Sequence, residues 1–345
     1  MSKIFKIASL AIATCMAGSA LSLQINFTYR PDLDAKVVQD FQMAANIWEG
    51  YFTNDVSVNI NIDYINYGAG FLGAASDNIG VYSYSSVKGG LAANANTTAA
   101  QTAVNHLQPG NSLNFWINHT AENGDSGTPY FDNNNSTNNQ NVQVTNANAK
   151  ALGLMDAHAG GQDAYISFNS FYDNIFAFHR QGFIDPVVGV DFVSVCEHEI
   201  GHAMGFYSGV DDVDEVEGYG EDNYFASVLD LFRKSRNAAG GLDMDMSADN
   251  REKYFSIDGQ NTLAQFSRGV VYGDGWQASH WQHFNDAASR YGIMDPRALR
   301  GAFYHETPLD VEALNVIGWQ TAVPEPTSMA VLGLGVIALI KRRKK

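Results

Sequence analysis

The decisive stretch of this chain is residues 191–206, Asp-Phe-Val-Ser-Val-Cys-Glu-His-Glu-Ile-Gly-His-Ala-Met-Gly-Phe. Its apolar residues recur at the spacing of a helix face: Phe192, Val195, Cys196 and Ala203. Asp191 precedes them in the place of an N-cap, and Gly205 permits the positive φ that ends a helix. The sequence therefore predicts a helix from Asp191 to Gly205.

Two histidines on this predicted helix share a face. Residues i and i+4 lie one above the other, so His198 and His202 can bind one metal ion through their imidazoles. Glu199 stands beside them as a base, which is the arrangement of zinc hydrolases. The alternative is a histidine pair on a purely structural helix, but such a site gives no reason for a glutamate between the histidines.

A catalytic zinc needs a third protein ligand and an open position for water. In the compact form of the motif the third ligand stands at position 208, which is Ser208 in this chain. Serine is a poor zinc ligand, so we expect the third ligand to come from elsewhere. Asp211, Asp212, His280 and His283 are the candidates.

Two later segments, Ser279-His280-Trp281 and Gly292-Ile293-Met294-Asp295-Pro296, carry a resemblance. With the helix motif they resemble the leishmanolysin-like branch of the metzincin zinc peptidases, also found in a bacterial secreted group. The resemblance covers residues 24–65, 191–207 and 277–319. It implies His280 as the third ligand after a long insertion, and Met294 as the methionine of a turn beneath the metal. Position 296 is Pro and not the Tyr that some metzincins use to stabilise the transition state, so that role has no candidate.

The N-terminal part of the chain shows a strand, a helix and a strand in sequence. Leu23–Tyr29 forms the first strand, and Val56–Tyr64 alternates apolar and polar residues as a half-buried strand does. Between them, apolar residues at helical spacing predict a helix over 34–52. This order suggests an open sheet with helices. The resemblance implies an α+β zincin fold, with a twisted mixed sheet, an active-site helix and an irregular or helical C-terminal subdomain.

The remaining signals are local, and we expect one domain over residues 23–320. Two further strands, one helix and one hairpin are predicted at Ile79–Tyr84, Ala164–Phe168, 97–107 and Tyr254–Phe266. Thr307 is placed to cap a last helix that Gly318 ends.

Polar stretches between these elements predict solvated loops. The asparagine-rich tract Asn133–Asn141 is interpreted as a surface loop, and the acidic run Asp211–Asp222 as solvated. Asp125 and Asp132 suggest a calcium ion as a second hypothesis, although their spacing matches no defined calcium loop.

Both ends of the chain carry targeting features. Residues 1–22 have the charged, apolar and small-residue order of a secretory signal peptide. Residues 321–345 contain Pro-Glu-Pro, a short apolar stretch and a basic end, and resemble the PEP-CTERM sorting tag of Gram-negative envelope proteins. The stretch of twelve residues is short for a membrane span, which needs about 20. An ordinary anchor is the alternative. Both interpretations, a sorting tag and an anchor, place the domain in the envelope or outside the cell. The domain would contact the membrane only through residues 321–345, until a membrane enzyme processes this segment.

The chain is acidic, with a formal net charge of −16 over 345 residues. Loss of both end segments leaves 14 basic and 36 acidic residues, a net charge of about −22. Such a domain repels nucleic acid and anionic lipid, so neither is an expected partner. Cys196 would be the one remaining cysteine, so no internal disulfide is expected, and we interpret it as buried and inert.

These features predict a secreted zinc endopeptidase whose partner is a protein or peptide substrate. Bound zinc would lower the pKa of a water molecule toward about 7, and Glu199 would take its proton and later deliver it to the leaving amine. The rival hypothesis is a non-enzymatic envelope or matrix protein with a structural or decayed metal site. A weaker one is a carbohydrate-binding surface module.

Overall fold

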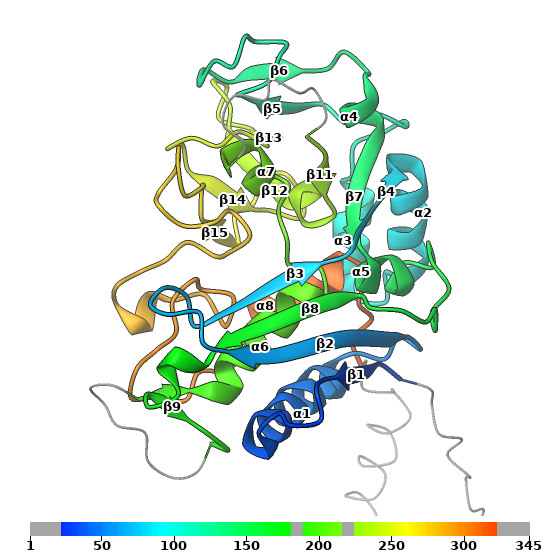
Figure 1. Cartoon of the computed structure of the whole chain (residues 1–345). Helices are drawn as coiled ribbons and strands as arrows, with labels where there is room; N and C mark the ends of the chain where they lie inside the picture. The colour runs from blue at the N-terminus through cyan, green and yellow to red at the C-terminus, as the bar shows by residue number, and fades with distance from the viewer. Residues whose placement is uncertain (1–21, 181–188, 216–223, 323–345) are drawn as a thin grey trace, which may run out of the picture.

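The computed structural model describes residues 22–180, 189–215 and 224–322 (Figure 1). Its central sheet has four strands in the order β1-β2-β8-β3. The first three run parallel, and β3 pairs antiparallel with β8 and forms one edge. The strands are β1 (Gln24–Thr28), β2 (Ser57–Ile65), β8 (Ala164–Asn169) and β3 (Gly73–Asp77). A mixed sheet with helices agrees with the expected α+β class.

Two helices pack side by side on one face of this sheet, α1 (Ala35–Tyr51) and α6 (Phe192–Ala203). Phe168 of the sheet contacts both Phe41 of α1 and Phe192 of α6, with ring centroids 5.2 and 4.7 Å apart. The indole nitrogen of Trp48 in α1 donates to the carbonyl of Glu197 at 3.0 Å. Each buried aromatic side chain contributes roughly 1.5–3 kcal/mol, so this aromatic contact holds α6 against the sheet.

A second part of the molecule lies above the central sheet in Figure 1. It contains a sheet of order β11-β7-β4 and another of order β13-β12-β14-β15, with the hairpin β5–β6. Its strands are β4 (Ile79–Ser83), β5 (Phe115–Ile117), β6 (Tyr130–Asp132), β7 (Asn141–Thr145), β11 (Ala226–Ser227), β12 (Arg233–Arg236), β13 (Leu242–Met244), β14 (Lys253–Phe255) and β15 (Ala264–Phe266). The β14–β15 pair confirms the predicted hairpin.

Short helices and two further strands connect these sheets. They are α2 (Tyr84–Asn94), α3 (Thr98–Asn105), α4 (Thr137–Gln140), α5 (Asn146–Ala151), α7 (Val210–Glu215), the 3-10 turns η1 (Ser170–Tyr172), η2 (Leu229–Phe232) and η3 (Ala287–Ser289), and the paired strands β9 (Phe176–Ala177) and β10 (Val190–Asp191). The last helix of the described residues, α8 (Pro308–Val316), starts at the predicted cap Thr307 and ends before Gly318, whose φ is +114°.

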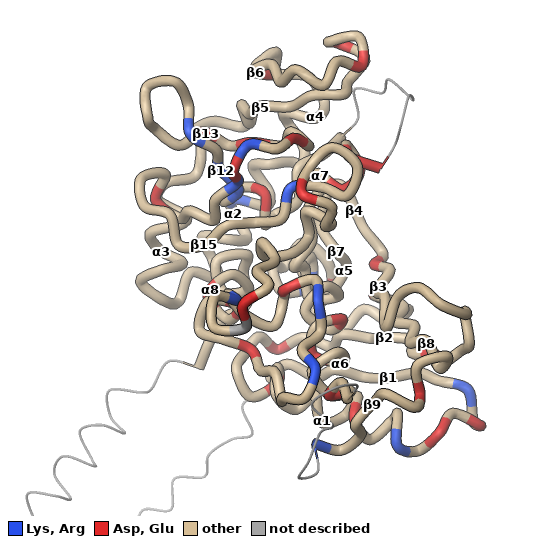
Figure 2. The backbone as a smooth tube through the Cα atoms, turned by 90° about the vertical axis from the view of Figure 1, so that its left-hand side faces the viewer, with Lys and Arg blue, Asp and Glu red and all other residues tan. Residues whose placement is uncertain are grey.

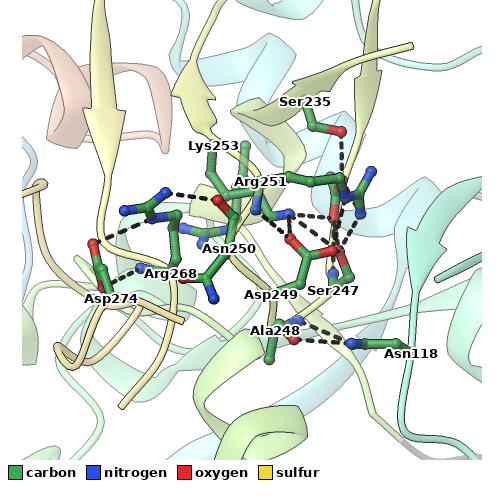
Figure 3. Close-up of polar contacts among 12 residues, drawn as sticks. Asn118, Ser235, Ser247, Ala248, Asp249, Asn250, Arg251, Lys253, Arg268 and Asp274 are labelled. Carbon is green, nitrogen blue, oxygen red and sulfur yellow. Dashed lines mark hydrogen bonds and ion pairs between the residues drawn. The ribbon is translucent and has the colours of Figure 1, made fainter. Parts of the chain in front are cut away.

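The sheet β13-β12-β14-β15 carries a cluster of paired charges, of which Lys253 and Asp245 are buried, drawn in Figure 3. The Lys253 ammonium is fully buried and lies 2.7 Å from Asp249 and 3.3 Å from Asp245. Arg251 lies 2.9 Å from Asp245 and 2.7 Å from Asp249. Buried charges persist only when they are paired, so this cluster fixes the loop between β13 and β14.

Two predictions for polar stretches were wrong. The tract Asn133–Asn141 contains α4, and Asn138 is buried and donates to Asp132 at 2.9 Å. In the acidic run, Asp211 and Asp214 are buried on α7 because their carboxylates accept backbone hydrogen bonds from distant loops. The rest of that run, residues 216–222, lies outside the described residues.

The predicted targeting segments lie almost wholly outside the described residues, which begin at 22 and end at 322. Within the described part of the chain, no helix is both long enough and apolar enough to cross a membrane.

Candidate metal centre

The helix α6 begins and ends as its sequence predicts. Asp191 caps it by accepting hydrogen bonds from the backbone nitrogen and hydroxyl of Ser194, at 3.3 and 2.6 Å. At the other end Gly205 has φ +109°, and its nitrogen donates to the carbonyl of His202 at 2.8 Å. The chain therefore turns away directly after the second histidine.

Three imidazoles converge next to this helix. The Nε2 atoms of His198 and His202 are 3.1 Å apart, and each lies 3.2 Å from Nε2 of His280. The structure thus brings together three residues that are separated by up to 82 positions in the chain. His280 is buried, and the other two are partly exposed.

The opposite ring nitrogen of each histidine faces a backbone carbonyl. The Nδ1 contacts are His198 to Ile293 at 2.8 Å, His202 to Phe206 at 2.7 Å and His280 to Gln277 at 3.2 Å. A carbonyl can only accept, so each Nδ1 carries the proton and each Nε2 presents its lone pair. Contacts of this kind orient metal-binding histidines.

This arrangement fits a cation better than a proton. Three lone pairs point at one another with no donor between them. Ligands about 2.0–2.1 Å from a tetrahedral zinc lie about 3.3 Å from each other, close to the separations found here. Burial lowers the pKa of all three imidazoles, and the neighbouring imidazoles add to this for His202 and His280. Together these causes bring the pKa of His202 to about 3. The rings are therefore neutral, as metal binding requires.

Glu199 lies between α6 and the edge strand β3. Its side chain is 5% exposed, and a Cβ built on Gly73 would be 3.1 Å from its Oε1. Burial raises the pKa of Glu199 to about 8, and the charge of Asp77 adds to the rise, while a hydrogen bond from the backbone nitrogen of Ala75 opposes it. A cation at the three histidines would favour the ionised carboxylate.

The loop that carries the third histidine is held by α7. The Asp211 carboxylate accepts hydrogen bonds from the backbone nitrogens of Ala278 and Ser279, at 2.5 and 3.1 Å, and from the Ser279 hydroxyl. Burial raises the pKa of Asp211 to about 7, although these bonds oppose the rise. Asp211 therefore supports the ligand loop and does not join the three imidazoles.

Ser208 supports the same loop from the position where the compact motif has a ligand. Its backbone nitrogen donates to the Ser279 hydroxyl at 2.9 Å, and its own hydroxyl donates to Asp230 at 2.6 Å. The segment after the helix therefore holds the loop of His280 in place.

Met294 lies directly beneath α6. A Cβ built on Gly201 would be only 2.6 Å from the Met294 sulfur, so any larger residue at position 201 would force the Met294 side chain to shift. Asp310 of α8 fixes the turn: it accepts from the backbone nitrogens of Ile293 and Met294, at 2.9 and 3.3 Å, and from the indole of Trp281 at 2.8 Å.

The other third-ligand candidates have different contacts. Asp212 accepts from Gln143 at 2.9 Å and from the Tyr207 hydroxyl at 3.1 Å. Nδ1 of His283 lies 3.0 Å from Asp295. Within the described ranges, neither belongs to a group that contains His198 and His202.

A second group of possible ligands lies around Glu197, with His305 and Glu306. Arg180 forms an ion pair with Glu197, and its Nη1 lies 3.0 Å from Nδ1 of His305. Arg180 thus already supplies positive charge there. Among the described groups, the three imidazoles offer the better cation site.

Asp125 and Asp132, named above for calcium, have separate contacts. Asp125 lies 3.3 Å from Nδ1 of His119, and Asp132 accepts from Asn134 and Asn138. In the described part of the chain they share no group of three metal-binding side chains. Cys196 is buried, and burial raises its thiol pKa, as expected for an inert cysteine.

The histidines and Glu199 line a cleft of about 990 Å³. One wall is β3 and the segment before it, residues 70–77, and the other is the loop after Met294, residues 295–300. Tyr207 and Trp276 also line it. Sequence reasoning missed the supporting roles of Asp211 and Asp310, because their partners are distant loops that no local pattern indicates.

Comparison with protein families matches residues 322–345 to the PEP-CTERM protein-sorting motif. No curated protein and no solved structure matched the chain. The motif indicates export to the envelope or the extracellular side of a bacterium, and it implies a sorting-tag processing enzyme in the membrane as a partner.

Proposed function

We propose that this chain is an exported zinc-dependent endopeptidase of the metzincin type, in the leishmanolysin-like branch. The observation that carries the proposal is the convergence of three neutral Nε2 atoms within 3.2 Å of each other, beside Glu199, on an open cleft. The PEP-CTERM motif is consistent with hydrolysis of protein substrates outside the cytoplasm.

His198, His202 and His280 would hold the zinc through Nε2, while the carbonyls at Nδ1 fix the tautomer and angle of each ring. Zinc bound there makes a water molecule acidic and polarises a peptide carbonyl. The set of three imidazoles leaves a position for that water, as in catalytic zinc sites.

Glu199 does the proton chemistry. Its carboxylate takes a proton from the attacking water, and its buried position favours the protonated form that then gives the proton to the leaving amine nitrogen. The contact with Ala75 holds the carboxylate against β3.

The edge strand β3 provides the means to bind a peptide. It pairs with β8 on one side only, and its residues line the cleft. An extended substrate can add to such an edge as a further strand, which brings one peptide bond beside Glu199.

The test compares purified mature protein with Glu199→Gln. We expect both to bind one zinc per chain by metal analysis, but only the wild type to digest casein, with loss of activity in a chelator and recovery with zinc. Glu312→Gln is the matched control, since Glu312 lies on α8 outside this cleft. Casein digestion by Glu199→Gln at the wild-type rate would refute the role.

The rival function is a structural zinc site in an envelope protein. It predicts bound zinc that stabilises the fold, with no digestion by either protein. The open cleft and the glutamate beside the three histidines favour the enzyme, since a structural zinc site needs neither a cleft nor a base.

A further inference from the structure

The cleft along β3 differs in charge at its two ends. Among its lining residues, Asp77, Asp212 and Glu215 belong to the end of β3 and to α7, whereas Arg297 and Arg300 belong to the loop after Met294. Asp295 also lines the cleft beside Arg297, but its carboxylate is paired with Arg290 at 3.4 Å. Figure 2 shows red acidic positions on α7 with a blue basic position beside them, and blue basic positions near α6 among red ones.

The acidic end lies where β3 finishes. After Asp77 the chain enters β4, which pairs antiparallel with β7. From β7, Gln143 donates to Asp212 on α7 at 2.9 Å. The end of β3 and the start of α7 are therefore joined through β7.

The basic end lies where β3 begins. The carbonyl of Leu72 accepts from Asn169 at 2.9 Å, at the end of β8. A few residues on, Ile175 accepts from Val190 at 2.8 Å, and Val190 bridges to Arg300. The start of β3 and the loop of Arg300 are therefore linked through the segment that follows β8.

The acidic groups differ in charge: burial raises the pKa of Asp77 to about 7, so this carboxylate is only partly ionised near neutral pH, and a cationic ligand would favour its ionised form. Asp212 contacts the neutral donors Gln143 and Tyr207. Oδ1 of Asp77 is buried with no hydrogen-bond partner among the described atoms. Arg297 at the far end is exposed. A low-dielectric cleft focuses such charges on a bound chain.

We propose that the cleft selects peptides whose charge changes sign across the cleaved bond, with basic residues at the Asp77 and Asp212 end and acidic residues at the Arg297 and Arg300 end. Antiparallel pairing with β3 is the more stable register. It places the N-terminal half of the peptide at the acidic end. The substrate therefore carries Lys or Arg before the cleaved bond and Asp or Glu after it. This inference rests on the proposed function.

The test uses three internally quenched peptides with one neutral centre. The first has two lysines before it and two glutamates after it, the second has the reverse order, and the third has glutamine at all four positions. We expect kcat/KM for the first to exceed that for the second by on the order of tenfold at low salt, and the ratio to fall as salt is added.

Charge-neutralising variants identify the residues. Asp212→Asn and Arg297→Gln should each reduce the ratio by about threefold, since one charge of several is removed. Asp55→Asn is the matched control, because Asp55 pairs with His158 outside the cleft and the same charge is lost. Its ratio should equal that of the wild type.

Two failures are distinguishable. Cleavage of casein or of the neutral peptide supports the proposed peptidase activity. If, at the same time, the two charged peptides are cut equally or the second is cut faster than the first, the proposed charge preference is overturned. If nothing is cut, the proposed function fails. Binding of the same peptides to zinc-loaded Glu199→Gln, followed by fluorescence anisotropy, then tests the charge preference without turnover, and equal affinities would overturn it.

Discussion

Replacement of Asp211 by Asn tests whether α7 holds the third ligand in place. At pH 8, above the pKa of about 7, the Asp211 carboxylate is ionised and accepts three hydrogen bonds from the Ala278–Ser279 segment. The side-chain amide introduced by Asp211→Asn would keep one acceptor oxygen, and its NH2 group would face the N–H and O–H donors of Ala278 and Ser279. The loop next to His280 then loses at least one of its anchors.

The size of the effect follows from these contacts. A hydrogen bond to a charged group contributes about 1.5–3 kcal/mol, and the new donor facing a donor adds to the loss. Part of this energy is recovered when the loop moves, and that movement displaces Nε2 of His280 from the other two imidazoles. Loss of an outer contact of this kind lowers metal affinity about 10–100-fold.

The assay is competition for zinc with a chromophoric chelator at pH 8, with thermal unfolding in excess zinc as a check on folding. Asp214→Asn is the matched control. Asp214 lies on the same helix, is also buried and accepts from the backbone nitrogens of Val271 and Tyr272 at 2.9 and 2.8 Å, in a loop without a proposed ligand. It should lose stability but keep zinc affinity within about threefold. The reasoning is refuted if folded Asp211→Asn binds zinc like the wild type, or if both variants lose affinity equally.

Three further predictions concern packing, pH and metal. Gly201→Ala should destabilise the fold by about 1–3 kcal/mol through overpacking against Met294, whereas Gly89→Ala on α2, with open space at its Cβ, should stabilise it by up to about 1 kcal/mol. Thermal unfolding checks both signs, and stabilisation by both would contradict the close contact. Burial raises the pKa of Asp249, but the Lys253 charge and the hydrogen bonds from Lys253 and Arg251 together outweigh burial and lower this pKa overall. The contribution of Asp249 to stability is therefore present above about pH 4 and is lost as pH falls through the folded-state pKa. Asp249→Asn should therefore unfold in less urea at pH 7, with a difference that disappears in acid; a constant difference would argue against the ion pair. Zinc at 100 times its Kd should stabilise the protein by about 2.7 kcal/mol, and His280→Ala should abolish this gain. An equal gain in that variant would exclude His280 as a ligand.

Much of the local structure could be predicted because its signals are local. The helix over 34–52 appears as Ala35–Tyr51, and Asp34 caps it with a bond to the Lys36 nitrogen at 3.0 Å. The strand at Val56–Tyr64 appears as Ser57–Ile65. Apolar period and capping residues lie within one element, so no tertiary information is needed.

Long-range packing explains what the sequence did not reveal. Asp211 and Asp214 have the composition of a solvated run, yet they are buried because loops more than 50 residues later donate to them. In the site, helix geometry alone places His198 beside His202. No periodic signal selects His280 over His283, since both precede the methionine turn, and the selection came from family resemblance. The metal roles of all three stay predictions.

The dependence of the methionine turn on Asp310 has a consequence for biosynthesis. A ribosome makes α8 after every histidine and after Glu199, and chains are made and fold from the N-terminus onward. A chain that stops before residue 310 contains the complete set of proposed reactive groups but lacks the carboxylate that holds Ile293, Met294 and Trp281. If the proposed hydrolysis is correct, truncated products are expected to be harmless to the cell that makes them, because α8 completes the proposed hydrolytic site.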